Sequence, residues 1–135
     1  MGEVFRRLFY HAVWATSNHE PQLTEALRPH VFRIIRDECT RLGCRLRGIN
    51  ALPDHLHVAL EIPPSLAVGA AIETLKDAVL RAMDRASPGA ICWQEGYGVV
   101  TFREAELDRT LRYIATQEAR HESANLAGML ENCGG

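Results

Sequence analysis

Two histidines separated by one residue, His55 and His57, carry the clearest chemical signal in the chain. They lie in the segment Ile49-Asn-Ala-Leu-Pro-Asp-His-Leu-His-Val-Ala-Leu-Glu-Ile62. If this segment is a β-strand, its two-residue period places both imidazoles on one face and turns Leu56 to the other. Two imidazoles side by side on a rigid strand can hold a metal ion, although the spacing alone also fits two ordinary surface histidines. The pair therefore predicts a strand, its orientation and a candidate site.

A second group of polar residues recurs at helical spacing near the C-terminal end. Tyr113, Gln117 and His121 are four residues apart, so a helix presents them as one stripe. A tyrosine hydroxyl with an amide oxygen one turn away suits a nucleophile beside a third metal ligand. By itself the tyrosine also fits a packing residue, and the glutamine fits a solvated side chain. The apolar residues that can dock this helix fall about 100° or more around its axis, and they are Leu107, Leu111 and Ile114.

The chemistry that these groups can support is phosphoryl transfer. A phosphodiester resists attack because negative charge builds up on its oxygens, and a divalent cation that neutralises this charge supplies much of the catalysis. Two imidazoles and an amide oxygen can hold Mg²⁺ or Mn²⁺, although nitrogen ligands alone favour softer metals. Tyrosine has an ordinary pKa of ~10, so it must lose its proton as it attacks, and it then carries a covalent phosphate.

The order of strand and helix patterns predicts the scaffold that positions these residues. The predicted elements are a strand over 5–16, a helix over 23–42 ended by Gly43, strands over 45–51 and 55–62, a helix capped by Ser65 that ends at 87–89, a strand or strand pair over 91–102, and a final helix from 104 to about 121. This β-α-β-β-α-β order predicts a ferredoxin-like α+β fold, with an antiparallel sheet, two helices on one face and a C-terminal helix that carries the tyrosine. Because Leu56, Val58 and Leu60 are needed beneath the two helices, we expect the histidines on the open face.

Length and composition indicate one globular domain over residues 1–135, with 47% hydrophobic residues. No apolar run approaches the ~20 residues of a membrane span, and the first residues lack the pattern of a signal peptide. The four cysteines form no Cys-x-x-Cys pair, so we expect reduced thiols in a cytoplasmic protein. The net charge of −2 argues weakly against a nucleic-acid partner, whereas the clustering of the arginines favours one.

Four segments of the sequence, taken in order, match the pattern of one protein family. They are Tyr10-His-Ala-Val-Trp-Ala-Thr16, Leu52-Pro-Asp-His-Leu-His57, Trp93-Gln-Glu-Gly-Tyr97 and Tyr113-Ile-Ala-Thr-Gln-Glu-Ala-Arg-His121. In these segments the chain resembles the small single-tyrosine HUH transposases, which are the IS200-like insertion-sequence transposases and their relatives associated with repetitive extragenic palindromes (REP). The resemblance covers nearly the whole chain. It implies an enzyme that cuts and rejoins single-stranded DNA at hairpin-marked ends through a 5′-phosphotyrosine, with Mg²⁺ or Mn²⁺ as cofactor.

Carried over by motif, the resemblance also implies a role for each candidate residue. His55 and His57 would be metal ligands, Gln117 the third ligand, and Tyr113 the nucleophile. It further implies a homodimer in which the tyrosine helix completes the site of the partner subunit. The candidate nucleic-acid-binding residues are Arg6, Arg7, His11, Arg45, Arg47, Lys76 and His121.

Other interpretations of the same residues stay open. The short tail after His121 and the missing basic surplus also fit a domesticated copy that binds single-stranded nucleic acid without cleaving it. An open four-stranded sheet with aromatic side chains serves RNA-recognition domains as well, and these need no metal. A small ferredoxin-like dimer that binds metal for a structural or sensory purpose is a third alternative. A cyclic phosphodiesterase is disfavoured because the sequence lacks paired His-x-Thr motifs. His11 also fits a packed strand residue, and the arginines also fit a solvated edge.

Overall fold

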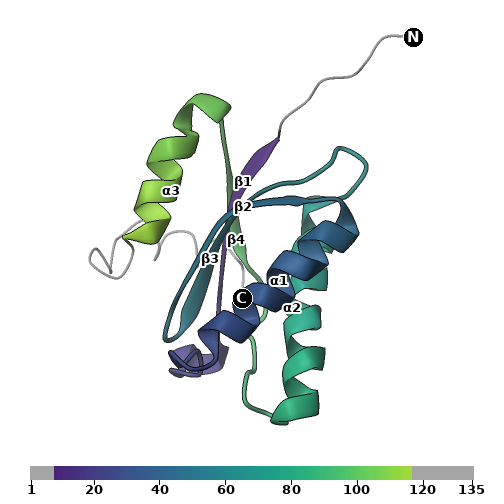
Figure 1. Ribbon diagram of the computed structural model, residues 1–135, viewed down its shortest axis with the longest axis vertical. Helices are drawn as coiled ribbons and strands as arrows, with labels where there is room; N and C mark the ends of the chain where they lie inside the picture. Colours follow the sequence, from purple (N-terminus) through teal and green to yellow (C-terminus); the bar gives the residue numbers. More distant parts are fainter. Residues whose placement is uncertain (1–7, 117–135) are drawn as a thin grey trace.

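The computed structural model describes residues 8–116 and arranges them as a sheet with helices on both faces (Figure 1). The strands are β1 (Phe9–Ala15), β2 (Arg45–Leu52), β3 (His55–Glu61) and β4 (Gly98–Phe102). The helices are α1 (Arg28–Leu42), α2 (Val68–Ala86) and α3 (Leu107–Ala115), and two short 3₁₀ turns are η1 (Ser17–His19) and η2 (Glu104–Glu106). None of the helices in this described range is long and apolar enough to cross a membrane.

The four strands form one sheet in the order β2-β3-β1-β4, and every neighbouring pair is antiparallel. This order, with α1 and α2 as the two connections, confirms the predicted ferredoxin-like arrangement. β2 and β3 are joined by the two-residue turn Pro53-Asp54. Because β3 pairs on both sides, His57 lies in the interior of the sheet, directly opposite Val13 of β1 and Asn50 of β2.

One face of the sheet carries the main hydrophobic core. Leu56, Val58 and Leu60 of β3 are fully buried on this face, as their alternation with the histidines predicts. α1 and α2 lie across it on the right of Figure 1. In each helix apolar residues recur at intervals of three and four, so they form a continuous stripe along that helix. The residues of these stripes that are buried include Val31, Ile35, Cys39, Ile72, Leu75 and Val79.

The first helix and the last strand are both shorter than the sequence pattern predicts. α1 begins at Arg28, although the apolar spacing starts at Leu23, because Pro29 lacks an N–H and fits only in the first turn of a helix. Residues 91–97 form only one bridge, and β4 begins at Gly98, because Gly96 adopts a φ of 90° and turns the chain out of the extended conformation.

The predicted helix caps have different outcomes. Gly43 ends α1 in the left-handed conformation, with a φ of 81°, as expected for a glycine at this position. The predicted cap at Ser65 is wrong, because α2 begins at Val68 and its N-cap residue is Ala67, which makes no side-chain cap. The final helix also begins later than predicted, since η2 comes first and α3 starts at Leu107.

The second face of the sheet is covered by α3 over β2 and β3, so the prediction of an open face above the histidines is wrong. α3 packs on β2 and β3, on the opposite side from α1 and α2 (Figure 1). Gly48 of β2 permits this close approach, because a Cβ at that position would lie 2.7 Å from Leu111 Cδ2. Asn50 of β2 donates from Nδ2 to the backbone oxygen of Ile114 at 2.8 Å, and the Ile114 side chain is buried. The resemblance implies that the tyrosine helix completes the partner's site. In the structure this helix lies on the histidine face of its own chain.

Candidate active site

His55 and His57 lie on the α3 side of β3, with ring centroids 5.1 Å apart. They are buried there, with exposed fractions of 5% and 0%. Burial, together with the neighbouring imidazoles of His11 and His55, lowers the pKa of His57 to about 3. His57 is therefore neutral at pH 7, which is the form that binds metals. Among the described residues, nothing forms a hydrogen bond with its buried Nε2 atom.

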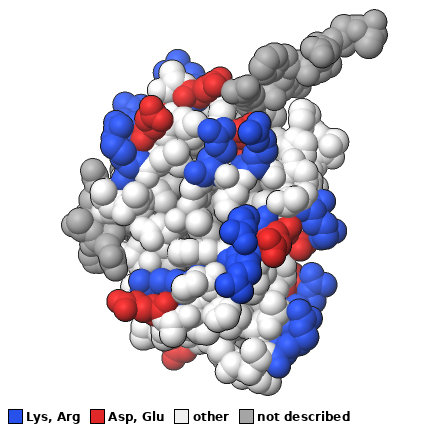
Figure 2. Space-filling model, viewed as in Figure 1, with Lys and Arg blue, Asp and Glu red and all other residues white. Residues whose placement is uncertain are grey.

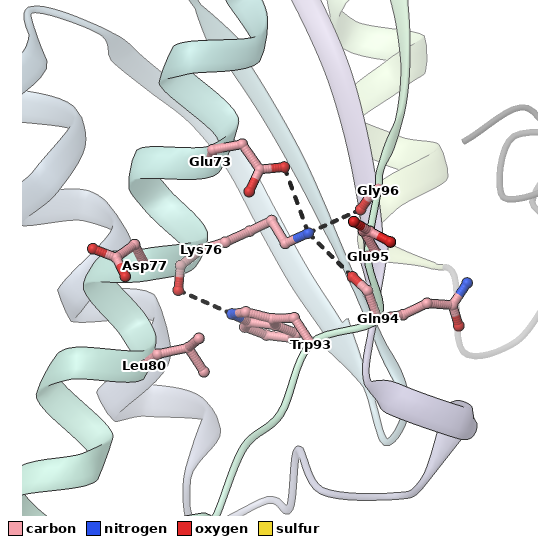
Figure 3. Close-up of a pocket in the computed structure, with 8 residues that line it drawn as sticks. All are labelled: Glu73, Lys76, Asp77, Leu80, Trp93, Gln94, Glu95 and Gly96. Atoms are coloured by element: carbon pink, nitrogen blue, oxygen red, sulfur yellow. Dashed lines mark hydrogen bonds and ion pairs between the residues drawn. The ribbon is translucent and has the colours of Figure 1, made fainter. Parts of the chain in front are cut away.

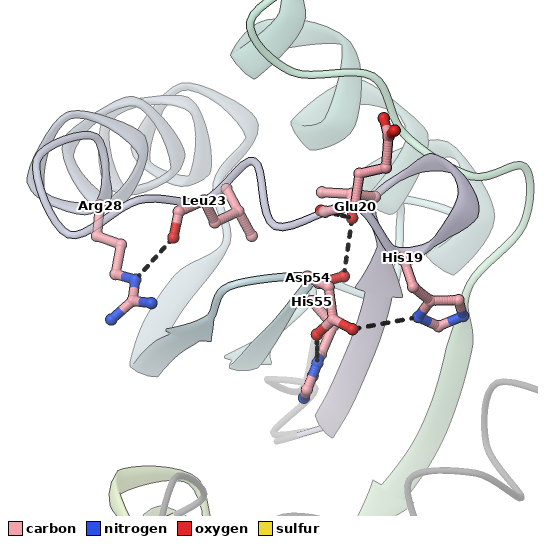
Figure 4. Close-up of polar contacts among 7 residues, drawn as sticks. His19, Glu20, Leu23, Arg28, Asp54 and His55 are labelled. Atoms are coloured by element: carbon pink, nitrogen blue, oxygen red, sulfur yellow. Dashed lines mark hydrogen bonds and ion pairs between the residues drawn. The ribbon is translucent and has the colours of Figure 1, made fainter.

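The Nδ1 atom of His55 is held by the preceding residue, Asp54. His55 Nδ1–H donates to Asp54 Oδ1 at 2.7 Å, and the second carboxylate oxygen lies 3.4 Å from Nδ1 of His19 (Figure 4). The backbone oxygen of Asp54 accepts from both the amide and the hydroxyl of Thr16, at the end of β1. A carboxylate on Nδ1 fixes the orientation of a histidine and makes its Nε2 a better metal ligand.

His57 is held at Nδ1 by a third histidine. Nε2 of His11, on β1, lies 2.9 Å from Nδ1 of His57 and shares a hydrogen bond with it. His11 is buried, with an exposed fraction of 6%, and burial lowers its pKa to about 4. The sequence predicts His11 as a nucleic-acid contact, and the structure places it beneath α3 with its ring against His57.

Tyr113 of α3 lies against the same rings. Its ring centroid is 6.2 Å from that of His57 and 6.0 Å from that of His11, with the rings edge to face in both pairs. Such pairs are favourable because the positive edge of one ring meets the negative face of the other. The sequence-predicted nucleophile and one sequence-predicted metal ligand are therefore neighbours within one chain.

The residues present fit a divalent metal in part. His57 contributes a buried nitrogen that a cation would satisfy, and His55 contributes an imidazole oriented by a carboxylate. Within residues 8–116, no three histidine, cysteine, aspartate or glutamate side chains are placed to hold a metal ion together. The predicted third ligand is a residue of another type, Gln117, and it lies outside the described residues.

Two of the candidate nucleic-acid-binding arginines lie on the edge strand β2. Arg45 is exposed, whereas Arg47 forms an ion pair with Glu61 of β3 at 2.5 Å and lies 6.0 Å from the centroid of the Phe9 ring. Figure 2 shows one face of the molecule, on which lysine and arginine side chains form separate groups, several of them beside acidic side chains. Three other candidates lie outside the described residues, namely Arg6, Arg7 and His121.

Lys76 does not join the site, because it lies on α2, at the other face of the sheet. Its buried ammonium donates to the backbone oxygens of Gln94 at 3.2 Å and Gly96 at 2.9 Å, and lies 3.8 Å from Glu73 (Figure 3). Its own backbone oxygen accepts from the indole of Trp93 at 3.0 Å. These contacts fix the segment before β4 against α2. The same residues line a cavity of about 440 Å³.

Three residues that shape the site were not identified from the sequence. Asp54 had a local signal, since it immediately precedes His55 in the turn. Gly48 and Asn50 had none, because their roles depend on where α3 docks on β2. Asn50 lies directly opposite His57, so the residue that anchors α3 is also a cross-strand neighbour of the buried histidine.

The fold and the site together define a class of protein. It is an α+β domain in which a histidine pair on a central strand faces a tyrosine on a C-terminal helix. Residues 4–117 match the family model of IS200-like transposases, and the chain belongs to this family. It is 26% identical to the ISDra2 transposase TnpA of Deinococcus radiodurans over 118 residues, which span 82% of this chain and 84% of that protein.

Solved structures agree with this assignment. A crystal structure of a transposase from Deinococcus radiodurans R1 superposes with a TM-score of 0.70 and 28% sequence identity, covering 87% of this chain and 96% of that one. A REP-associated tyrosine transposase bound to a REP hairpin has the same fold, with a TM-score of 0.66 and 16% identity, covering 90% of this chain and 75% of that one. The family match over residues 4–117 makes the chain a DNA transposase.

Proposed function

We propose that this transposase cleaves and rejoins single-stranded DNA through a covalent bond to Tyr113. His55 and His57 would hold a Mg²⁺ or Mn²⁺ ion together with Gln117, and the ion would draw charge from the phosphate under attack. Hairpin-marked DNA ends are the proposed substrate. The REP hairpin bound to a structural relative supports this choice.

Each step of the proposed reaction balances without an external energy source. The hydroxyl oxygen of Tyr113 attacks the phosphorus and gives up its proton to solvent. The bond from phosphorus to the 3′ oxygen breaks, so the 5′ phosphate remains on the tyrosine and the 3′ oxygen takes up a proton. Attack by another 3′-OH reverses these events, which joins two DNA ends and frees the tyrosine.

The observation that carries this proposal is the contact between Tyr113 and the buried ring of His57. A nucleophile and a metal ligand must reach the same phosphate, so they must be neighbours. Burial of His57 also supports the proposal, because a site that excludes bulk water strengthens the electrostatic interactions within it.

The direct test is to trap the adduct on a labelled single-stranded hairpin DNA in the presence of Mg²⁺ or Mn²⁺. The wild-type chain should form a covalent protein–DNA species that resists denaturing electrophoresis, and chelation with EDTA should abolish it. Tyr113→Phe removes only the hydroxyl and should form none. Equal adduct from wild type and Tyr113→Phe would refute the role of this tyrosine. Metal-independent hairpin binding with no adduct would favour the domesticated binding module instead.

The homodimer is a further part of the proposal, and it can be arranged in two ways. The family resemblance implies that the tyrosine helix completes the partner's site, whereas in this chain Tyr113 lies against its own His57. We propose that the arrangement within one chain is competent for cleavage. A mixture of Tyr113→Phe and His57→Ala chains should then remain inactive, because no chain holds both groups. Restored activity in the mixture would require the helix to act on the partner's site.

A further inference from the structure

The strand register places His11 beside the proposed metal ligand His57. His11 of β1 is directly opposite Ala59 of β3, so it is the diagonal neighbour of His57 on the same sheet face. The two rings have centroids 5.1 Å apart and are tilted by 32°, and the 2.9 Å hydrogen bond joins His11 Nε2 to His57 Nδ1. Neither ring can turn freely, because both are buried beneath α3.

This single hydrogen bond determines which nitrogen of His57 carries a lone pair. Two neutral imidazoles share one proton between the bonded nitrogens. With the proton on Nδ1 of His57, its Nε2 has a lone pair and can bind a cation. With the proton on Nε2 of His11, the Nε2 of His57 must carry its own proton and cannot bind a cation. In that second form a buried N–H would also have no acceptor among the described residues, which is costly.

His11 differs from Asp54, which holds the other histidine of the pair. Asp54 is a charged acceptor at the edge of the site, where it also reaches His19. His11 is a neutral acceptor buried at its centre, against the ring of Tyr113 as well as His57. A carboxylate at this central position would add a negative charge beside the phosphate that the site is proposed to bind. A neutral acceptor orients His57 without this repulsion.

We propose that His11 is a positioning residue: it accepts a hydrogen bond from His57 Nδ1 and so keeps His57 in the tautomer that presents Nε2 to the metal. The inference rests on the proposed function for the identity of the ligand at Nε2. The tautomer itself is a property of the metal-free chain and is measured without DNA or activity.

Two substitutions separate the hydrogen bond from the ring contact. His11→Phe keeps an aromatic ring against Tyr113 and removes the acceptor, whereas His11→Gln keeps an acceptor oxygen and removes the ring. Val100→Ala is the control, because Val100 lies directly opposite His11 on β4 and is exposed. The metal-free full chains are labelled with ¹⁵N and the histidine ring nitrogens are assigned by NMR, and Mn²⁺ binding is then measured by calorimetry.

Wild type, His11→Gln and Val100→Ala should show His57 protonated at Nδ1 and bare at Nε2. His11→Phe should lose this preference and bind Mn²⁺ about 10–100 times more weakly, as is typical when the partner of a metal-binding histidine is removed. A His57 tautomer and a Mn²⁺ affinity unchanged in His11→Phe would overturn the inference. Failure of the proposed metal site is recognised separately, since Mn²⁺ affinity would then not change in His57→Ala, while the NMR result still decides the role of His11.

Discussion

Acidification from pH 7 to pH 5 should destabilise the metal-free protein through the two buried histidines. Burial lowers the pKa of His57 to about 3 and that of His11 to about 4, against an ordinary value of 6.5. In the unfolded chain both imidazoles are exposed and take up protons as the pH falls through 6.5. In the folded chain both stay neutral at pH 5, so protonation favours unfolding. Their contribution to stability is fully present above pH 6.5 and is lost as the pH falls toward the folded pKa values.

The size of the effect follows from the same pKa values. Between pH 6.5 and pH 5, protonation of each histidine in the unfolded chain lowers the free energy of unfolding by about 1.4 kcal/mol per pH unit. This amounts to about 2 kcal/mol per histidine. Together they remove about 4 kcal/mol, a large share of the ~5–15 kcal/mol that stabilises a typical domain. The two rings share a hydrogen bond, so their contributions are expected to be coupled rather than strictly additive.

Urea denaturation in the presence of EDTA measures this effect, at several pH values between 5 and 8. His57→Gln cannot take up a proton, so its loss of stability from pH 7 to pH 5 should be about 2 kcal/mol smaller than that of wild type. His30→Gln is the matched control for the replacement of an imidazole, because His30 is exposed on α1. If His57→Gln and wild type lose the same stability over this range, burial does not hold His57 neutral in the folded chain.

Three further predictions concern the packing of α3 and the charge at the edge of the site. Gly48→Val should destabilise the fold by about 1–3 kcal/mol in urea denaturation and lower the yield of adduct, since a Cβ there would clash with α3; wild-type values for both would refute the close approach. Asn50→Leu should cost about 0.5–1.5 kcal/mol by the same assay, because it removes the hydrogen bond to Ile114, and no loss would show that this bond contributes nothing. Glu61→Gln should release Arg47 from its ion pair and strengthen hairpin binding. The slope of log affinity against log salt concentration should become steeper by about 1, as expected for one added phosphate contact. A fluorescence titration at several salt concentrations measures this, and unchanged affinity would show that Arg47 does not contact DNA.

The strand that carries the histidines was predictable because its pattern repeats within a few residues. Leu56, Val58 and Leu60 must be buried together, and a period of two then places His55 and His57 on the opposite face. The order of the elements was predictable for the same local reason. The start of α2 was not, since a cap at Ser65 looks as good in sequence as the observed start after Ala67.

The covering of the histidine face by α3 could not be predicted, because it depends on contacts between distant segments. Gly48 and Leu111 come close only once β2 and α3 are both formed, and neither residue signals the other. The bond between His11 and His57 depends in the same way on the register of β1 against β3. A shift of one residue in that register would turn His11 to the opposite face.

The complete burial of His57 has a consequence for how fast a metal ion reaches the site. An exposed fraction of 0% means that no ion can reach Nε2 while the surrounding groups keep these positions. Loading then requires a local opening, and displacement of α3 from β2 and β3 is the motion that uncovers this face. At high metal concentration the loading rate should therefore reach a limit set by the opening rate rather than by diffusion. The contacts of Gly48 and Asn50 with α3 would thus govern how quickly the transposase becomes competent, in addition to how stable it is.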